Sequence, residues 1–479
     1  MKKILLGFLS VFTLISMTSC DEDRLDVEPI FDEIYTGEIK DEAQMGQFVN
    51  NIYNSLASSG NFSSNIILYG DLISENVFIS LDNTSGYHTT ANGLNWSQDT
   101  GIGAWRSLYD VVQKSNAVIL DNNVPSNENV VSYKGEAKIA RGLAYFYLIQ
   151  QFASTPTSGQ YQEYGVPIVL GTYDPSLLPA RSTVNEVYDL IIKDLTEGIV
   201  EMSPSARTSK TFLSPTAGKF ILSKVYLTRG QAGDYDKAIQ YADEVLTNSP
   251  SNYALLSNTT DAINDYFTGT TVAKYEEGDE TIFEIEQNLN YTNGVNGHLG
   301  TFYSSTGAHR GFVVREGVYK LFNDTDIRKG LYNEFTASKL DDPKGYFTKK
   351  YPRSVGGNYA GNIKVFRMTE ALYIKMEALA KKGESATALT MLNERATTLG
   401  ATAYTGDALT AILLDAQKEF LAEGHRFYDL KRNMLGFDKK TNCGGQNCAI
   451  DANSEYFVFP ISLTERLLNP NITQHPLWQ

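Results

Sequence analysis

Residues 216–246 read TAGKFILSKVYLTRGQAGDYDKAIQYADEVL and hold two helical patterns joined by a short turn with two glycines. In the second pattern, apolar side chains recur at i, i+3, i+4, i+7, i+10 and i+11 from Tyr235, which predicts an amphipathic helix with Asp234 as its cap. The first pattern carries small residues, Ala217 and Gly218, where the two helices would meet. Helices that approach closely across such a turn are typical of a tetratricopeptide-type unit.

The helical pattern recurs along the chain. A further long helix is predicted over 409–423, and Thr183 or Ser182 can cap a helix together with Glu186. The other predicted helix pairs are 137–148 with 187–199, 368–382 with 385–397, and 41–56 with 105–120. The sequence therefore predicts an all-α, tetratricopeptide-like helical-repeat scaffold of about four helix pairs.

Two long segments interrupt this scaffold. Residues 57–104 and 250–364 are rich in Gly, Asn, Ser, Thr and Tyr, and the helical period fails there. Short alternating runs, such as TIFEIE at 281–286, predict a few short strands. Because loops this long in a compact protein are usually functional, we expect these two segments to carry the function of the protein.

The acidic net charge of the chain argues against one class of partner, the nucleic acids. The chain has 479 residues, with 41 Lys+Arg against 56 Asp+Glu and a formal net charge of -15. It holds no basic run longer than the Lys2–Lys3 pair. The phosphate-neutralising charge on which nucleic-acid binding depends is therefore missing, and no nucleic-acid partner is expected.

The N-terminus has the pattern of an export signal. Lys2 and Lys3 precede an apolar run over 4–17 that is too short to span a bilayer, and small residues lead to Cys20. We expect residues 1–19 to be removed as a lipoprotein signal peptide and Cys20 to be acylated and attached to the membrane, although ordinary cleavage with a free thiol is the alternative. Residues 20–38, which begin with several acidic side chains, would then form a lipidated tether.

The other two cysteines lie close together in the C-terminal part. Cys443 and Cys448 are separated by four residues, two of them glycines, so a small disulfide loop is expected in an exported protein. A zinc site would need two further ligands, and none of the five histidines lies at ligand spacing from this pair. No metal site is predicted there.

A set of motifs in fixed order resembles the RagB/SusD (SusD-like) family of nutrient-uptake outer-membrane lipoproteins of Bacteroidetes. The resemblance covers nearly the whole chain, because the motifs begin at the lipoprotein signal and end near residue 476. They are WRSLY at 105–109, EAKIARGLAYFY at 136–147, GVP at 165–167, RSTVNEVY at 181–188, RMTEALYIKMEA at 367–378, EFLAEGHRFYDLKR at 419–432 and the tail from FPISLTE at 459–465 to TQHP at 473–476.

The resemblance implies a fold in which the helical-repeat scaffold carries a long-loop, partly irregular ligand-binding lobe. It also implies a function. A member of this family would sit on the outer membrane facing the cell exterior, capture an oligosaccharide or polysaccharide, and deliver it to a SusC-like TonB-dependent β-barrel transporter. A peptide-binding member is the alternative, and a lipid-anchored glycoside hydrolase is the third possibility. The expected organisation is an N-terminal SusD-like region over 39–250, a ligand-binding insertion over 251–364 and C-terminal RagB/SusD helices over 365–479.

A sugar ligand requires an exposed aromatic face for stacking and amide, acidic or guanidinium groups that bracket hydroxyls. The stretches 69–96 and 288–310 supply both, in a setting that is otherwise ordinary Gly/Asn loop. The predicted ligand-binding residues are Asp71, Tyr87, Trp96, Tyr291, Asn293, Asn296, Tyr303 and Arg310.

No catalytic motif was found, and the protein is expected not to be an enzyme. The nearest candidate is Glu284 with Glu286, two carboxylates on one face of a predicted strand, for which a solvated face is the simpler interpretation. The charged residues within 419–432 are expected to form a structural ion-pair network. No cofactor is predicted. An oxygen-rich run, NDTDIR at 323–328, leaves calcium open, although an Asp326–Arg328 pair is the simpler interpretation.

Overall fold

The structure is a computed structural model. It describes residues 38–203, 207–269, 271–288, 290–336, 344–352, 359–443 and 448–479. The predicted signal peptide, Cys20 and all but the last residue of the predicted tether lie outside the described residues. No helix in the described part is both long and apolar enough to cross a membrane. The proposed boundaries between the N-terminal region, the insertion and the C-terminal region stay predictions.

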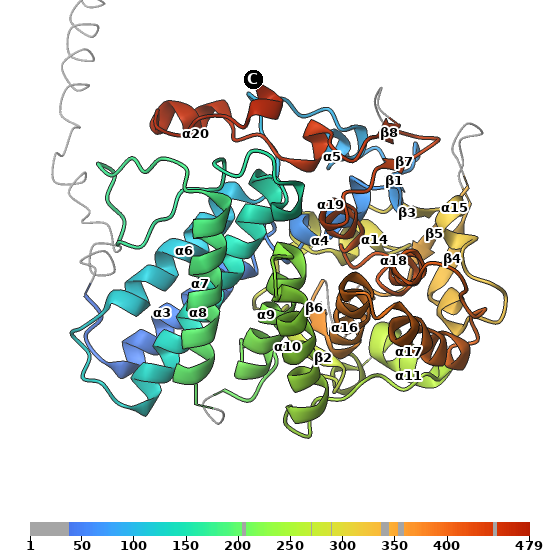
Figure 1. The fold of residues 1–479 in the computed structure, drawn as a ribbon, viewed down its shortest axis with the longest axis horizontal. Coiled ribbons are helices and arrows are strands. Elements are labelled where there is room, and N and C mark those ends of the chain that lie inside the picture. The colour runs from blue at the N-terminus through green and yellow to red at the C-terminus, as the bar shows by residue number, and fades with distance from the viewer. Residues whose placement is uncertain are drawn as a thin grey trace, which may run out of the picture.

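A row of packed helices forms the scaffold, and the predicted pairs are confirmed (Figure 1). The 216–246 pair is α9 (Pro215–Arg229) with α10 (Asp234–Asn248). The remaining members of the row are α3 (Glu42–Leu56), α6 (Trp105–Leu120), α7 (Glu128–Phe152), α8 (Val184–Glu201), α16 (Met368–Lys382), α17 (Ser385–Thr398) and α18 (Ala408–Glu419).

Local sequence explains where several of these helices begin. Thr183 and Glu186 form a reciprocal capping box at the start of α8, as predicted. Asp234 is not a cap, because Gly233 occupies that position in a left-handed conformation. The Asp234 carboxylate instead accepts hydrogen bonds from Arg229 Nε and Nη2, each at 2.8 Å. This ion pair ties the first residue of α10 to the last residue of α9.

Small residues allow close helix contacts, but the nearest neighbours of Gly218 belong to α8 and α7, and not to α10 as the pattern predicted. A Cβ on Gly135 of α7 would lie 2.8 Å from Gly198 O of α8, and a Cβ on Gly198 would lie 2.6 Å from Gly135 O. Gly218 of α9 would likewise meet Ile199 Cγ1 at 2.6 Å. A side chain at any of these positions would push the backbones apart.

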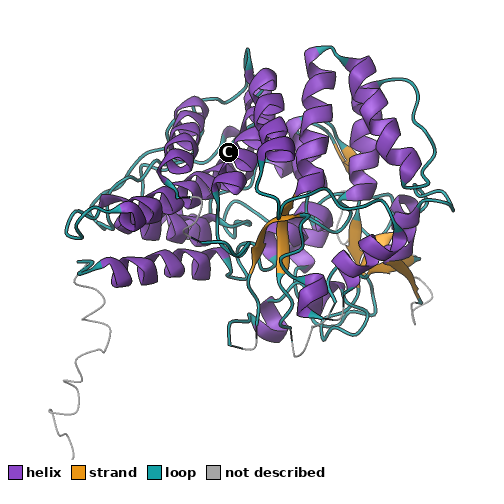
Figure 2. Ribbon diagram, turned by 90° about the horizontal axis from the view of Figure 1, so that it is seen from below, coloured by secondary structure: helices purple, strands orange, loops and turns teal. Residues whose placement is uncertain are grey.

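The long segments form a lobe with short strands, and Figure 2 shows the strands gathered in one half of the molecule. A four-stranded antiparallel sheet has the order β1 (Val77–Ile79), β3 (Phe312–Arg315), β5 (Gly345–Thr348), β4 (Tyr332–Phe335). Two smaller ladders pair β2 (Thr281–Ile285) with β6 (Ile363–Arg367) and β7 (Phe437–Asp438) with β8 (Ala449–Ile450). Because β1 comes from one long segment and β3 from the other, this sheet joins the two.

Short helices complete the lobe and the C-terminal part. They are α4 (Asn65–Leu72), α5 (Thr89–Gly93), α11 (Thr260–Thr268), α12 (Val272–Tyr275), α13 (Gly294–Gly297), α14 (Gly300–Tyr303), α15 (Glu316–Tyr319), α19 (Arg426–Arg432) and α20 (Leu463–Leu468), with 3-10 turns at Pro156–Ser158, Ile327–Leu331, Glu455–Phe457 and Pro476–Trp478. One large apolar core runs through the row of helices and into the lobe, and a second lies between α16, α17 and α18.

Buried ion pairs fasten the lobe to α18 and the turn that follows it. The Arg367 guanidinium contacts Glu280, Glu419 and Glu423 at 3.1, 2.9 and 2.7 Å. Arg328 similarly joins Asp415 and Glu419. The predicted structural network is therefore present, and it draws its cations from β6 and the lobe as well as from 419–432. Removing one partner would leave a buried charge without its counter-ion, which is strongly destabilising. These pairs therefore fix the lobe relative to the helices.

Candidate ligand-binding site

The two loop stretches flagged in the sequence meet at one end of the four-stranded sheet. Ile79 at the end of β1 pairs with Phe312 at the start of β3, so the chain leaving β1 runs beside the chain entering β3. The Asn83 side-chain amide continues this contact, because its Nδ2 donates to His309 O at 2.8 Å and Arg310 O at 2.9 Å. Sheet register therefore brings stretch 69–96 next to stretch 288–310.

An aromatic cluster lies at this junction, formed by Tyr87, His88, Phe302 and His309. The rings of Tyr87 and His309 lie 4.5 Å apart between centroids, and His309 stacks on buried Phe302 at 5.8 Å. Exposed Asn296 places its Oδ1 2.9 Å from His309 Nε2. Tyr87 and His309 are half-buried, whereas Arg310 is exposed. The cluster thus offers partly exposed rings beside an amide and a guanidinium.

Burial keeps the two histidines of this cluster neutral at ordinary pH. Desolvation, with a smaller contribution from nearby His309, lowers the pKa of His88 to about 4. Burial also lowers the pKa of His309. Neutral imidazoles can both donate and accept hydrogen bonds, as a hydroxyl-rich ligand requires.

A pocket of about 420 Å³ opens beside Tyr291. Tyr291 is 65% exposed, and its ring stands on the loop that follows β2. The pocket is lined by two further aromatic side chains, Tyr53 and Phe212. Its amide side chains are Asn50, Asn54, Gln287 and Asn290. Exposed aromatic surface next to amides is the combination that sugar recognition needs.

Hydrogen bonds hold the Tyr291 loop against the chain that leaves α3. Asn293 Nδ2 donates to Ala57 O at 2.5 Å and to Ser63 Oγ at 2.9 Å. The Asn293 amide is therefore committed to the protein, and its role at the pocket is to position the loop. Asn290 and Tyr291 extend from that anchored loop.

The far wall of the pocket is built from α3. The Tyr53 hydroxyl donates to the buried Glu136 carboxylate and accepts from Leu213 N at 2.8 Å. Arg207 Nη1 donates to Asn50 Oδ1 at 2.9 Å, and its guanidinium carbon lies 4.4 Å from the centroid of the Phe212 ring. Burial raises the pKa of Glu136 to about 7.

The sequence interpretation missed Asn50, Tyr53 and Asn54, because it assigned residues 41–56 to the scaffold alone. Asn50 and Asn54 lie four residues apart and therefore share one face of α3. Their exposed amides, next to a half-buried tyrosine, were the available signal.

Three predicted ligand residues are buried, so their expected role as exposed ligand contacts is wrong. Trp96 is 4% exposed and packs edge-on against Tyr456 and Phe459 of the C-terminal tail. Tyr303 is fully buried and stacks on Tyr351. Asp71 is also fully buried.

The Asp71 carboxylate has partners within the protein. It accepts from Asn76 Nδ2 at 2.6 Å and from Gly424 N at 2.6 Å. Burial raises the pKa of Asp71 to about 7. The group therefore fixes the contact between α4 and the turn at residue 424.

The expected solvated face of Glu284 and Glu286 is also wrong. Register shifts on both sides of Phe283 disturb the alternation of β2, and all five residues of the strand are buried. Glu284 accepts from Asn362 Nδ2 at 2.7 Å and from Glu277 N at 2.9 Å, while Glu286 lies past the strand end and is exposed. Burial raises the pKa of Glu284. The two carboxyls do not share a cleft face.

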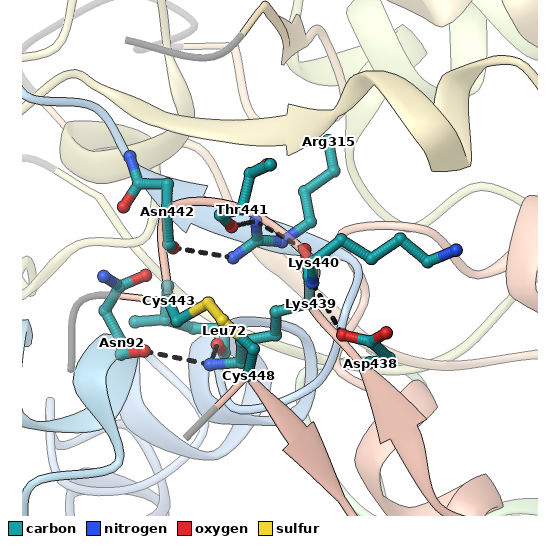
Figure 3. The surroundings of a disulfide bond; sticks show 10 residues. All are labelled: Leu72, Asn92, Arg315, Asp438, Lys439, Lys440, Thr441, Asn442, Cys443 and Cys448. Atoms are coloured by element: carbon teal, nitrogen blue, oxygen red, sulfur yellow. Dashed lines mark hydrogen bonds between the residues drawn. A yellow bond between two sulfur atoms is a disulfide. The ribbon is translucent and has the colours of Figure 1, made fainter. Parts of the chain in front are cut away.

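The structure joins Cys443 to Cys448 by a disulfide, with the two Cα atoms 5.3 Å apart. Figure 3 shows how this segment is fastened to the lobe. Arg315 Nη2 donates to Asn442 O at 3.1 Å, and Lys439 Nζ donates to Asn92 O at 2.9 Å and Leu72 O at 3.1 Å. Buried Arg315 of β3 thus bonds to a carbonyl of this segment, and buried Lys439 of the segment bonds to carbonyls of α4 and α5.

The oxygen-rich run at 323–328 is occupied by protein contacts. Asp326 accepts from Arg328 Nε and Nη2, both at 2.9 Å, and Lys418 Nζ lies 3.3 Å from its Oδ2. This agrees with the structural interpretation of the Asp326–Arg328 pair. Among the described residues, no group of three or more His, Cys, Asp or Glu side chains could hold a metal ion.

These features define a helical-repeat protein whose inserted loops carry an aromatic and amide-lined pocket. The chain belongs to the SusD family, whose model matches residues 231–478. A second family model, described as starch-binding and associating with the outer membrane, matches residues 23–227. No curated protein matches the chain.

Solved structures share the fold over nearly the whole length. A proposed sugar binding protein from Bacteroides vulgatus is 25% identical, with a TM-score of 0.79 over 92% of this chain and 100% of that one. A SusD superfamily protein from Bacteroides thetaiotaomicron is 24% identical, with a TM-score of 0.80 over 91% and 99%. Another from Bacteroides vulgatus is 23% identical, with a TM-score of 0.80 over 92% and 100%.

Proposed function

We propose that this protein is a non-enzymatic glycan-binding lipoprotein of the outer membrane. It captures an oligosaccharide or polysaccharide outside the cell and delivers it to a SusC-like TonB-dependent β-barrel transporter. The observation that carries the proposal is the pocket beside Tyr291, where an exposed aromatic ring stands among amide side chains. Family membership and the sugar-binding description of a relative support the same ligand class.

Within this proposal, the ring of Tyr291 stacks on the C–H face of a pyranose and the amides bracket its hydroxyls. Asn54 and Asn290 line the pocket and can supply both donors and acceptors. Tyr87, Asn296 and Arg310 form a second contact area for an extended ligand at the aromatic cluster. The anchored Asn293 keeps the Tyr291 loop in place.

In this proposal, acyl chains on Cys20 attach the protein to the membrane. Several acyl chains supply about 0.8 kcal/mol for each buried CH₂, which is enough for stable anchoring without a spanning helix. The non-enzymatic assignment is supported by the separation of Glu284 and Glu286, since one is buried with protein partners and the other is exposed.

Polysaccharide affinity electrophoresis of the purified protein tests the ligand class. The panel should contain starch, other neutral glucans, mannans, xylans and pectins. We expect at least one glycan to retard the unaltered protein and Tyr291→Ala to abolish most of that retardation. Tyr173→Ala is the matched control, because Tyr173 is 75% exposed but lies in the loop between α7 and α8 and does not line the Tyr291 pocket.

Two outcomes would count against the proposal. One is unchanged mobility of the unaltered protein on every glycan. The other is equal retardation of Tyr291→Ala and the unaltered protein, which would show that the Tyr291 pocket does not bind the glycan. Binding of oligopeptides by calorimetry, in the absence of any glycan effect, would favour a peptide ligand instead.

A further inference from the structure

An exposed apolar surface is formed by residues that are distant in sequence from the Tyr291 loop. It consists of two segments, and we call it the leucine face. Its most exposed members are Tyr173 at 75%, Leu467 at 72%, Leu468 at 70% and Leu177 at 61%. Leu170, Leu178 and Leu463 are exposed as well. Exposed apolar side chains gathered on neighbouring segments mark contact surfaces, whereas single scattered ones do not.

Hydrogen bonds hold the two segments of the leucine face together. Asn471 Nδ2 donates to Leu178 O at 2.7 Å, and Asn469 Nδ2 donates to Pro179 O at 2.9 Å. Arg181 Nε also donates to Thr473 O at 2.9 Å. In Figure 1, α20 lies at the edge of the molecule next to the loop that joins α7 to α8. The face is therefore a fixed feature of the fold.

Helix α20 contributes nothing to the core of this chain. None of its six residues is buried, although Leu463 and Leu467 lie four residues apart on one helical face. Leu467 and Leu468 are 72% and 70% exposed, and apolar surface left in water is unfavourable unless a partner covers it.

The chemistry of the leucine face favours a protein occupant over a lipid one. Segment 171–178 is exposed throughout and has no helix or strand, so several of its peptide groups would be left unpaired in hydrocarbon. Segments that lie on membranes carry an excess of Lys and Arg, whereas on this face and its flanks Arg181 and Arg466 are balanced by Asp174 and Glu465, and there is no lysine. A protein surface can both cover the leucines and hydrogen-bond the loop.

We propose that the leucine face is the surface through which this chain docks on its outer-membrane β-barrel transporter. The partner rests on the function proposed above, whereas the location rests on the side chains described here. From Cys20 to residue 38 the chain can extend roughly 60 Å at most, so an anchored body stays within reach of a barrel rim. In Figure 1, the start of α3, the α7–α8 loop and α20 lie toward the same side of the molecule.

The test uses the full lipidated chain, expressed in its native host together with a SusC-like TonB-dependent β-barrel transporter of that host. A tag on this chain recovers both proteins from detergent extracts, and the molar ratio of transporter to chain is measured. We expect the double variant Leu467→Asp with Leu468→Asp, and separately Leu177→Asp, to lower that ratio about tenfold. Val200→Asp is the matched control, since Val200 is 80% exposed on α8 outside the leucine face, and its ratio should stay unchanged.

Several outcomes would overturn the location. These are an unchanged ratio in both leucine-face variants, an equal loss in Val200→Asp, or no recovery of transporter by the unaltered chain. Loss of a homodimer instead of the transporter complex would assign the face to a second copy. Circular dichroism checks that the variants fold. The same variants should still be retarded by glycan as strongly as the unaltered protein. If the proposed ligand class is wrong, the unaltered protein shows no glycan retardation but still recovers the transporter.

Discussion

Asn83 Nδ2 donates to the carbonyl oxygen of His309 at 2.8 Å, across a separation of 226 residues. A second bond from the same amide reaches Arg310 O at 2.9 Å. One side chain thereby fixes the loop after β1 to the loop before β3. The aromatic cluster of Tyr87 and His309 stands on this contact.

Asn83→Ala should loosen the junction, because two backbone carbonyls lose their donor. We expect the free energy of unfolding to fall by about 1–2 kcal/mol, as measured by urea denaturation. Asn83→Asp keeps the size but lacks the donor, so it should cost at least as much. Unaltered stability in both variants would show that the loops are held by other contacts.

Glu136 should make stability depend on pH. Burial raises the pKa of Glu136 from 4.5 to about 7 in the folded chain. Because the folded value lies above the unfolded one, the contribution of this group is fully present below pH 4.5 and is lost as pH rises to about 7. The loss amounts to at most about 3 kcal/mol.

Glu136→Gln removes this titration but can still accept the Tyr53 hydroxyl bond. Its stability should therefore change less between pH 4.5 and pH 7 than that of the unaltered protein, when followed by urea denaturation at several pH values. Glu128→Gln, at the exposed start of the same helix, is the control. Parallel pH profiles for Glu136→Gln and the unaltered protein would contradict the assignment.

Gly70 should tolerate no side chain. A Cβ there would lie 2.0 Å from Gly424 O, so α4 and the turn after α18 would have to separate. We expect Gly70→Ala to destabilise the protein by about 3 kcal/mol in thermal or urea unfolding. Gly317→Ala in α15 is the control, because nothing lies within 4 Å of its added Cβ, and it should be neutral or slightly stabilising. Equal stability of the two variants would disprove the close contact.

The scaffold was predictable because its signals are local. Apolar spacing, small residues and the Thr183–Glu186 box each act within a few residues, so α7 to α10 and α16 to α18 could be found from the sequence. The loop pairing was not predictable in this way. It depends on the register of Ile79 with Phe312, which no local pattern encodes.

The errors at the site have the same origin. Trp96 sits in a Gly/Asn/Ser stretch, but the tail residues Tyr456 and Phe459, some 360 positions later, cover it. Strict alternation of side chains along the strand predicted that Glu284 is exposed, whereas the irregular pairing of β2 with β6 buries it. Tyr291 remained exposed because its loop is anchored through Asn293 and not through its own ring.

The most direct measurement is a crystal structure of the protein with the oligosaccharide that affinity electrophoresis identifies. We expect a pyranose ring stacked on Tyr291, with hydroxyls within hydrogen-bond distance of Asn54 or Asn290. A ligand bound elsewhere on the molecule, with the Tyr291 pocket empty, would contradict it.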